Sequence, residues 1–353
     1  MTKSRLKKQS CVMSRVISEQ ELQRDGKGRW LSLDGSVYDV SDFLESHPGG
    51  PEALEEWLGR DASSAFRDGG HSHSSAALAL LPAMRVGSMP GARAAPSAGT
   101  SKAQEKAALL IDGSRPYTFQ VGLLGKEYQE WVHTPIHVKE PLVLLGSWME
   151  PFTKVHWWVP LVFWCPAIVA MLWYASTKWL WHQIVPLYLG MAVLGWPLLE
   201  YVLHRVVYHM DTESYWGNTA HFLFHGVHHL TPMDKTRLVA PPVLAIFIST
   251  PLILAVYLLA PSAAFAWTMA AGGFSGYLAY DMSHYAMHHA SLPFEWLRKL
   301  KAHHMAHHYG HPNENFGVSN VWTDDVFGSR IPGEKEATEA AEAIAAAKRM
   351  KAA

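Results

Sequence analysis

The sequence has 353 residues, of which 49% are hydrophobic, 12% aromatic and only 17% charged. A soluble domain has about 25% charged residues, yet the mean hydropathy of −0.02 is too low for a chain that lies in the membrane throughout. The net charge of −1 argues against a nucleic-acid partner. Cys11 and Cys165 lie too far apart in the chain to indicate a disulfide framework or a cysteine-based zinc site. We therefore expect a soluble part and a membrane part, both working in a reducing compartment.

Residues 12–87 form the first predicted domain, of the α+β class. Short strand-like runs alternate with helical stretches, at Trp30 to Leu33, Val37 to Val40, Pro51 to Leu58 and Ser74 to Leu80. The basic segment before it leads into no apolar run, so we expect no cleavable signal peptide.

Two histidines of this domain lie beside glycines. His47 begins a His-Pro-Gly-Gly turn, and His71 follows Gly70. The stretches WLSLDGSVYDVSDFLESHPGG and LGRDASSAFRDGGHS resemble the cytochrome b5 family. That resemblance implies a haem b with His47 and His71 as axial ligands, an arrangement that suits electron transfer. His73 is the alternative second ligand, which the Gly-His-Ser context disfavours, and a domain of this fold without haem is the other alternative.

Residues 88–115 form a predicted flexible linker, because the stretch from Ser88 to Lys106 is rich in Pro, Gly, Ala and Ser. The membrane domain follows at residues 116–331. A charged, Ala-rich tail at 332–353 ends the chain, and we assign it no chemistry.

Long stretches without charged residues predict four transmembrane helices. The stretch between Lys154 and Lys178 contains 23 such residues, and the stretch from Leu238 to Tyr280 contains 43, interrupted by a turn at Pro261. About 20 apolar residues cross a bilayer core of ~30 Å. The predicted spans are residues 156–177, 180–202, 240–260 and 262–283. Buried helices of a large soluble core are the alternative.

Four spans place both termini on the same side of the membrane. Of the 30 Lys and Arg residues, only Lys178 would then lie on the opposite side, so the positive-inside rule makes the side of the termini cytoplasmic. The membrane would be the endoplasmic reticulum in a eukaryote and the inner membrane in a bacterium.

Fourteen of the 21 histidines fall between residues 204 and 311, at the cytoplasmic ends of the predicted spans. Ten of them form a pair, a triple, a pair and a triple. Residues three and four apart share a helix face, so His225, His228 and His229 are expected to converge, as are His304, His307 and His308. His284 and His288 also share a face. His204 and His209 are five apart, so they need a distorted last turn or serve different metals. Ten imidazoles divide into two metals of about five ligands each.

The same motifs carry a second resemblance. HRVVYH, HFLFHGVHHLTPMDKTRLVAPP, YDMSHYAMHH and HHMAHHYGHPNENFGVSNVWTDDVFGS are similar to the fatty acid 2-hydroxylases of the fatty acid hydroxylase superfamily, in which a fused cytochrome b5 domain is typical. The implied fold is an all-α membrane domain of four spans with a cytoplasmic, His-rich dimetal cap. The implied metal ligands are His204, His209, His225, His228, His229, His284, His288, His304, His307 and His308.

Several polar residues lie inside these motifs but outside the ligand pattern. We expect them to support the ligands from behind or to line the pocket; they are His221, His289, His303, Asp281 and Asp324. His303 directly precedes His304, so which of the two binds metal stays open, although the HxxHH pattern selects His304. Five aromatic residues could line an acyl slot or simply pack, namely Tyr201, Tyr208, Phe222, Tyr280 and Tyr285.

The implied reaction is the O₂-dependent 2-hydroxylation of a fatty acyl chain, either free or as the N-acyl group of a ceramide. Such chemistry needs a redox metal and electrons, so we expect iron as the working metal, with zinc possible in the isolated protein. An NAD(P)H-dependent cytochrome b5 reductase or an equivalent donor would supply the electrons through the haem domain.

Three alternatives are carried forward. A desaturase also combines His boxes with cytochrome b5, but its boxes usually run HxxxH, HxxHH, HxxHH. A sterol or carotenoid hydroxylase of the same superfamily would lack the haem domain. A membrane electron carrier or a metal transporter explains the haem or the histidines, but not both.

Overall fold

The computed structural model describes residues 15–25, 29–44, 47, 51–68, 75–92, 101–136, 138 and 140–334. The chain divides into two compact units. The first consists of Met1–Ser147, Thr212–Asp234 and His288–Leu292, and the second of Trp148–Asp211, Lys235–Met287 and Pro293–Ala353.

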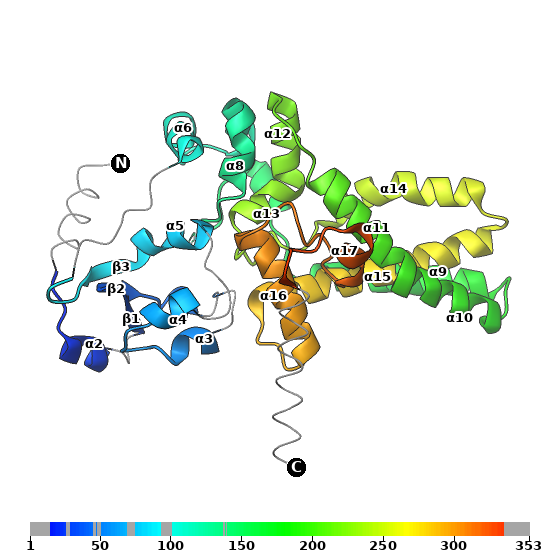
Figure 1. Ribbon diagram of the computed structural model, residues 1–353. Coiled ribbons are helices and arrows are strands. Elements are labelled where there is room, and N and C mark those ends of the chain that lie inside the picture. Colours follow the sequence, from blue (N-terminus) through cyan, green and yellow to red (C-terminus); the bar gives the residue numbers. More distant parts are fainter. Residues whose placement is uncertain are drawn as a thin grey trace, which may run out of the picture. The chain divides into compact units, whose positions relative to one another are not determined.

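The first unit begins with a small α+β segment (Figure 1). Its antiparallel sheet has the order β1 (Trp30–Leu33), β2 (Ser36–Asp39) and β3 (Arg85–Ser88). The first strand has the predicted bounds and the second begins and ends one residue earlier than predicted, whereas β3 has no predicted counterpart. The turn between β1 and β2 is Asp34-Gly35, with φ of 49° and 76°. Both angles are positive, as the common two-residue hairpin requires, and an Asp-Gly pair adopts them readily.

Short helices accompany this sheet: α2 (Glu19–Asp25), α3 (Glu52–Glu55), α4 (Ser63–Asp68) and α5 (Ser75–Met84). The core beneath them is formed by Leu31, Leu33, Tyr38, Val40, Leu44 and Ala62, with Leu54 of α3 and Phe66 of α4 packed against it.

The rest of the first unit is helical. Its elements are α6 (Lys102–Leu110), α7 (Thr118–Val121), the 3-10 helix η3 (Gly122–Glu127), α8 (Tyr128–Val132), α12 (Tyr215–His221), the π-helical turn η7 (Phe222–Gly226) and α13 (Val227–Leu230). Tyr128, Val132, Phe222 and Leu230 are buried together in one core.

The prediction of a flexible linker over residues 88–115 does not hold for α6. Ser101 and Gln104 form a capping box that starts this helix. Ala103 and Ala107 are buried in the core of the helical part. Small side chains therefore let α6 pack closely, although the same composition is also typical of linkers.

The second unit contains the long helices. Apart from Ser147 and the last two residues of α15, which belong to the first unit, it comprises the 3-10 helix η4 (Ser147–Thr153), α9 (Val159–Ser176), the continuous run α10 (Trp181–Gly190), η5 (Met191–Gly195), α11 (Trp196–Val202) and η6 (Leu203–Tyr208), then α14 (Pro242–Leu259), α15 (Ala263–His289), α16 (Glu295–Tyr309) and α17 (Trp322–Phe327). Both η5 and η6 are π-helical.

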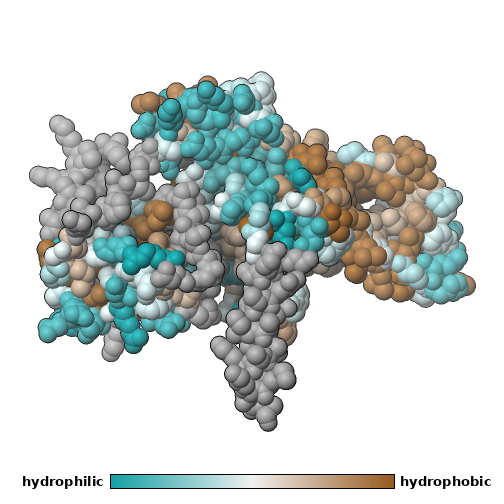
Figure 2. Space-filling view, in the orientation of Figure 1, coloured by the Kyte–Doolittle hydropathy of each residue, from teal (hydrophilic) through white to brown (hydrophobic). Residues whose placement is uncertain are grey.

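Among the described residues, three helices are long and apolar enough to cross a membrane: Val159–Ser176, Trp181–Tyr208 and Pro242–Leu259. Their side chains stay exposed, as Val162, Trp173 and Phe247 illustrate, and Figure 2 shows hydrophobic surface over α9 and α14. Exposed apolar surface of this extent indicates a membrane protein.

The fourth predicted span, 262–283, lies within α15 but is not one of these three. Its glycines and alanines lower its mean hydropathy and let it pack closely against other helices of the unit. A Cβ on Gly272 would lie 2.6 Å from the Tyr188 carbonyl oxygen, and one on Gly276 would lie 2.4 Å from the Trp196 Cβ. Small residues four apart allow such close approach of membrane helices.

Candidate metal centre

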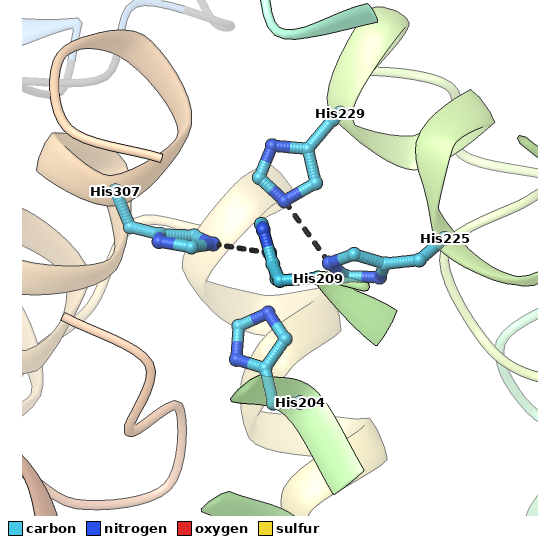
Figure 3. Close-up of side chains that lie close together, drawn as sticks. All are labelled: His204, His209, His225, His229 and His307. Atoms are coloured by element: carbon cyan, nitrogen blue, oxygen red, sulfur yellow. Dashed lines mark hydrogen bonds between the residues drawn. The ribbon is translucent and has the colours of Figure 1, made fainter. Parts of the chain in front are cut away.

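Ten histidines lie in two groups of five, and within each group one ring nitrogen of every residue lies within 4.8 Å of the others. The first group is His204, His209, His225, His229 and His307 (Figure 3). The second group is His228, His284, His288, His304 and His308. These are the ten residues that the sequence assigned as ligands, and all but the half-buried His209 are buried.

His204 and His209 share the first group because their helix ends in the π-helical turn η6. A π-helix pairs residue i with residue i+5, and the His209 amide donates to the His204 carbonyl at 2.9 Å. Their ring centroids are 4.8 Å apart. Of the two possibilities left open by the sequence, the distorted last turn is the one observed.

Each HxxHH triple is split between the two groups. The Nε2 atoms of His225 and His229 lie 3.0 Å apart, whereas the ring of His228 lies 4.9 Å from that of His288. The expectation that all three converge is therefore wrong. On a helix, the side chains of residues i and i+4 point only about 40° apart around the axis, whereas those of residues i+3 and i+4 point about 100° apart. The first and last histidines of a triple can therefore share one group while the middle histidine faces the other.

The second triple divides in the same way. The Nε2 atoms of His304 and His308 are 3.0 Å apart, and the His307 Nε2 lies 3.0 Å from the His209 Nε2. Hence His304 and His308 belong to the second group and His307 to the first.

These distances fit two bound metal ions. Two imidazole nitrogens that each lie about 2.1 Å from one ion, at roughly a right angle, are about 3.0 Å apart. The Nδ1 of His204 donates to the Phe316 carbonyl at 2.6 Å, and the Nδ1 of His307 donates to the Glu314 carbonyl at 2.7 Å. Protonation of Nδ1 leaves the Nε2 lone pair directed at the centre, as in many metal-binding histidines.

His303 has surroundings that exclude metal binding. Its Nε2 lies 3.0 Å from the Asp324 carboxylate and its Nδ1 lies 2.9 Å from the Glu334 carboxylate. Burial acts to lower the pKa of His303, but hydrogen bonds to the two carboxylates outweigh it and the pKa is raised. Both ring nitrogens of His303 face carboxylates instead of the other histidines. The geometry therefore selects His304, as the HxxHH pattern did.

The other residues expected near the ligands have different partners. The buried His221 pairs its Nδ1 with the Tyr128 hydroxyl at 2.6 Å. The ring of the half-buried His289 lies 6.0 Å from that of His288. Asp281 accepts hydrogen bonds from the Tyr277 hydroxyl, at 3.0 Å, and from the Ala240 amide. The Asp281 carboxylate therefore bonds to its own helix and to the segment that precedes α14.

The aromatic residues proposed for an acyl slot occupy several sites. Tyr280 stacks beside His284 at 5.5 Å, and the Tyr208 ring lies 6.4 Å from that of His204. Phe222 is buried in the core of the helical part of the first unit. Tyr201 stacks on Phe327, and Tyr285 packs on Trp157. Phe222, Tyr201 and Tyr285 therefore make ordinary packing contacts.

One histidine near the site gave no sequence signal. His133 ends α8, and its ring lies 4.8 Å from that of His229. Burial lowers the pKa of His133 to about 4, which keeps the ring neutral. His133 and His137 are four residues apart in the sequence, but they lie far from the four histidine motifs, and only the packing of α8 places His133 beside His229.

The haem site is described in part. His47 follows the turn after β2 and lies edge-on to Phe43, with ring centroids 5.7 Å apart. His71 and its alternative, His73, lie outside the described residues.

Comparisons with known proteins agree with both halves of the chain. Residues 17–90 match the cytochrome b5-like heme/steroid binding domain, and residues 189–329 match the fatty acid hydroxylase family. A fatty acid 2-hydroxylase of Macaca fascicularis is 33% identical over 343 residues, covering 86% of this chain and 91% of that protein. The ceramide very long chain fatty acid hydroxylase SCS7 of Saccharomyces cerevisiae is 33% identical over 352 residues, with 86% and 90% covered.

Two further relatives cover about two thirds of the chain. The dihydroceramide fatty acyl 2-hydroxylase FAH2 of Arabidopsis thaliana is 39% identical over 230 residues, 65% of this chain and 96% of that protein. A solved structure described as full length scs7p, with only its hydroxylase domain visible, is 35% identical with a TM-score of 0.61, covering 66% of this chain and 90% of that one.

A cytochrome b5-like segment, apolar helices and clustered imidazoles together define a membrane-bound lipid hydroxylase with its own haem domain. These relatives are all named as fatty acid or ceramide fatty acyl hydroxylases. The chain belongs to the fatty acid 2-hydroxylases of the fatty acid hydroxylase family.

Proposed function

We propose that this enzyme inserts one oxygen atom of O₂ at C2 of a fatty acyl chain, with electrons relayed through the cytochrome b5-like domain. The observation that carries the proposal is the pair of five-imidazole groups, with ring nitrogens spaced for metal ions. Two bound metals, with iron as the working metal, would supply the O₂ reduction that hydroxylation of a C–H bond requires. The other oxygen atom takes up two electrons and two protons and leaves as water. Zinc fits the same nitrogen ligands and could replace iron in the isolated protein.

The substrate in this proposal is a fatty acid, either free or amide-linked in a ceramide. The names of the relatives include both kinds, from fatty acid 2-hydroxylase to dihydroceramide fatty acyl 2-hydroxylase. The electron donor is an NAD(P)H-dependent cytochrome b5 reductase or its equivalent, and His47 and His71 hold the haem b that accepts its electrons.

The proposed topology has four spans, with α15 as the fourth and both termini on the cytoplasmic side. The excess of Lys and Arg on the side of the termini supports it. The ten imidazoles then lie at the cytoplasmic end of the spans, where an acyl chain can approach from the bilayer.

Lipid mass spectrometry tests the function. The full chain is expressed in a host without 2-hydroxylated lipids, supplied with both free fatty acid and ceramide. We expect new 2-hydroxyacyl species with the wild type, and their loss in both His304→Ala and His47→Ala. His182→Ala is the matched control, because this histidine is exposed and lies outside both groups.

A new double bond in place of the hydroxyl group would instead establish a desaturase. No new lipid, from a protein with haem and metals verified as bound, would overturn the proposal.

A further inference from the structure

The segment between α16 and α17 has every backbone amide of residues 316–319 bound to a carboxylate. The amides of Phe316 and Gly317 donate to Asp324 at 2.8 and 2.7 Å. The amides of Val318 and Ser319 both donate to Glu200 at 2.8 Å. We name residues 314–319 the carbonyl loop, because its carbonyl groups at Glu314 and Phe316 accept hydrogen bonds from histidines of the first group.

Those carbonyl groups hold ligands of the first metal group. Phe316 accepts from His204 at 2.6 Å, and Glu314 accepts from His307 at 2.7 Å. The Phe316 ring also lies 5.8 and 5.7 Å from the rings of His204 and His307. One short loop therefore orients two ligands that come from different helices, η6 and α16.

Burial of the Glu200 and Asp324 carboxylates has a desolvation cost. Glu200 is 4% exposed and Asp324 is 0% exposed, and Glu200 belongs to the apolar run Trp181–Tyr208. A buried carboxylate is unfavourable unless hydrogen bonds compensate it, and an acid in an apolar helix usually has a function. The function of Glu200 shown by its contacts is to hold the loop, since Ser319 also donates its hydroxyl to it.

The backbone of the carbonyl loop is tightly packed at Gly317. A Cβ on Gly317 would lie 2.2 Å from the Asn320 carbonyl oxygen and 2.7 Å from the Asp324 carboxylate. Glycine is therefore required for the amide of residue 317 to approach Asp324 so closely.

We infer that Glu200 and Asp324 are positioning residues for the first metal, acting through the carbonyl loop on His204 and His307. The inference rests on the proposed dimetal function, since it assigns these carboxylates to one of its two metals. Partners that orient metal-binding histidines typically change metal affinity by about 10–100-fold when they are removed. The effect here falls on the first group, because both oriented ligands belong to it.

The test measures bound metal, independently of any reaction. Full-length protein in detergent is loaded with zinc, and the affinity of each metal is measured by competition with a chelator. We expect Glu200→Ala to weaken one of the two metals by about 10–100-fold and to leave the other unchanged. Glu200→Gln is expected to restore affinity, because its amide oxygen accepts from the same amides and its amino group donates to the Ser319 hydroxyl.

Two more variants separate positioning from general destabilisation. Gly317→Ala displaces the loop while both carboxylates stay, so we expect it to weaken the same metal. Glu150→Ala is the matched control. It removes another largely buried carboxylate, bound to Arg237 at 2.6 Å, and should leave both metals bound.

Double variants identify which metal is weakened. His209→Ala removes a ligand of the first group and His308→Ala one of the second. Adding Glu200→Ala to His308→Ala should weaken the one metal that remains, whereas adding it to His209→Ala should leave the remaining metal unchanged.

Equal weakening of both metals by Glu200→Ala would overturn the inference, as would unchanged affinity or a failure of Glu200→Gln to restore it. If the wild type does not bind two metals, the dimetal proposal itself fails, and that outcome is visible before any loop variant is made.

Discussion

His303 and His304 are adjacent in the chain but occupy different chemical environments. Neighbouring residues of a helix point about 100° apart, so His303 faces Asp324 and Glu334 while His304 faces His284 and His308. The HxxHH pattern could select the ligand, because it depends on spacing within one helix. The carboxylates that hold His303 come from positions 21 and 31 residues further along the chain, and no local pattern pairs them with it.

Replacing each of these histidines by glutamine should separate the two environments. We expect His303→Gln to keep both metals, because Asp324 retains the loop amides, but to lower the free energy of unfolding by about 3 kcal/mol through the broken buried pair. His304→Gln should lose one metal. Metal content per chain and thermal unfolding measure the two effects, and a His303→Gln protein that binds a single metal would contradict the assignment.

At the scale of the element, periodicity could predict which histidines share a helix but not how helix geometry divides them. The two triples and the pair His284 and His288 stand out by their helical spacing, and the family resemblance implies the full set of ten. The separation of His228 from His225 and His229 depends on which histidines of other helices lie beside each ring. The π-helical turn between His204 and His209 was only one of two possibilities, because the sequence gives no sign of where an i+5 hydrogen bond replaces an i+4 bond.

The helix α15 shows the same limit for the spans. The absence of charged residues predicts its range. The reason for its small residues is close packing against Trp196, which is distant in the sequence. The stretch that contains α6 likewise has the small-residue composition of a flexible linker. Composition alone does not reveal that Ala103 and Ala107 are buried.

Two glycines of α15 offer a direct test of this packing. A Cβ on Gly276 would overlap the Trp196 Cβ at 2.4 Å, whereas one on Gly273 would meet only the Met191 methyl carbon at 3.6 Å, an ordinary contact. We expect Gly276→Ala to lower the free energy of unfolding by about 1–3 kcal/mol. Gly273→Ala should be neutral or stabilising, since alanine favours a helix by roughly 0.5–1 kcal/mol over glycine. Unfolding in detergent compares the two, and equal stability would exclude close packing at Gly276.

At the scale of the whole molecule, the proposed topology depends on whether α15 crosses the membrane. Three apolar helices alone would leave the residues after α14 on the side opposite the N-terminus, whereas a fourth span returns the chain to the starting side. The predicted cytoplasmic position of both termini requires the second arrangement.

Labelling of single cysteines with a membrane-impermeant maleimide distinguishes these topologies. The chain has only Cys11 and Cys165, so serine at both positions gives a background without cysteine. We expect cysteine at position 352 to react from the cytoplasmic side, and Thr177→Cys and Ser262→Cys to react from the other side. Detergent-treated samples, in which all three should react, are the control. Labelling of position 352 from the same side as Ser262→Cys would show that α15 does not cross.

The π-helical turn at Leu203–Tyr208 holds one residue more than a regular turn would. A helix that absorbs an inserted residue in this way keeps its axis and its flanking contacts, while the side chains beyond the insertion rotate to a new face. A membrane helix with one histidine at its end could thus acquire a second inward-facing histidine by a single-codon insertion, without rebuilding the span. The pairing of His204 with His209 in the first group would then need one mutational step instead of a rebuilt helix.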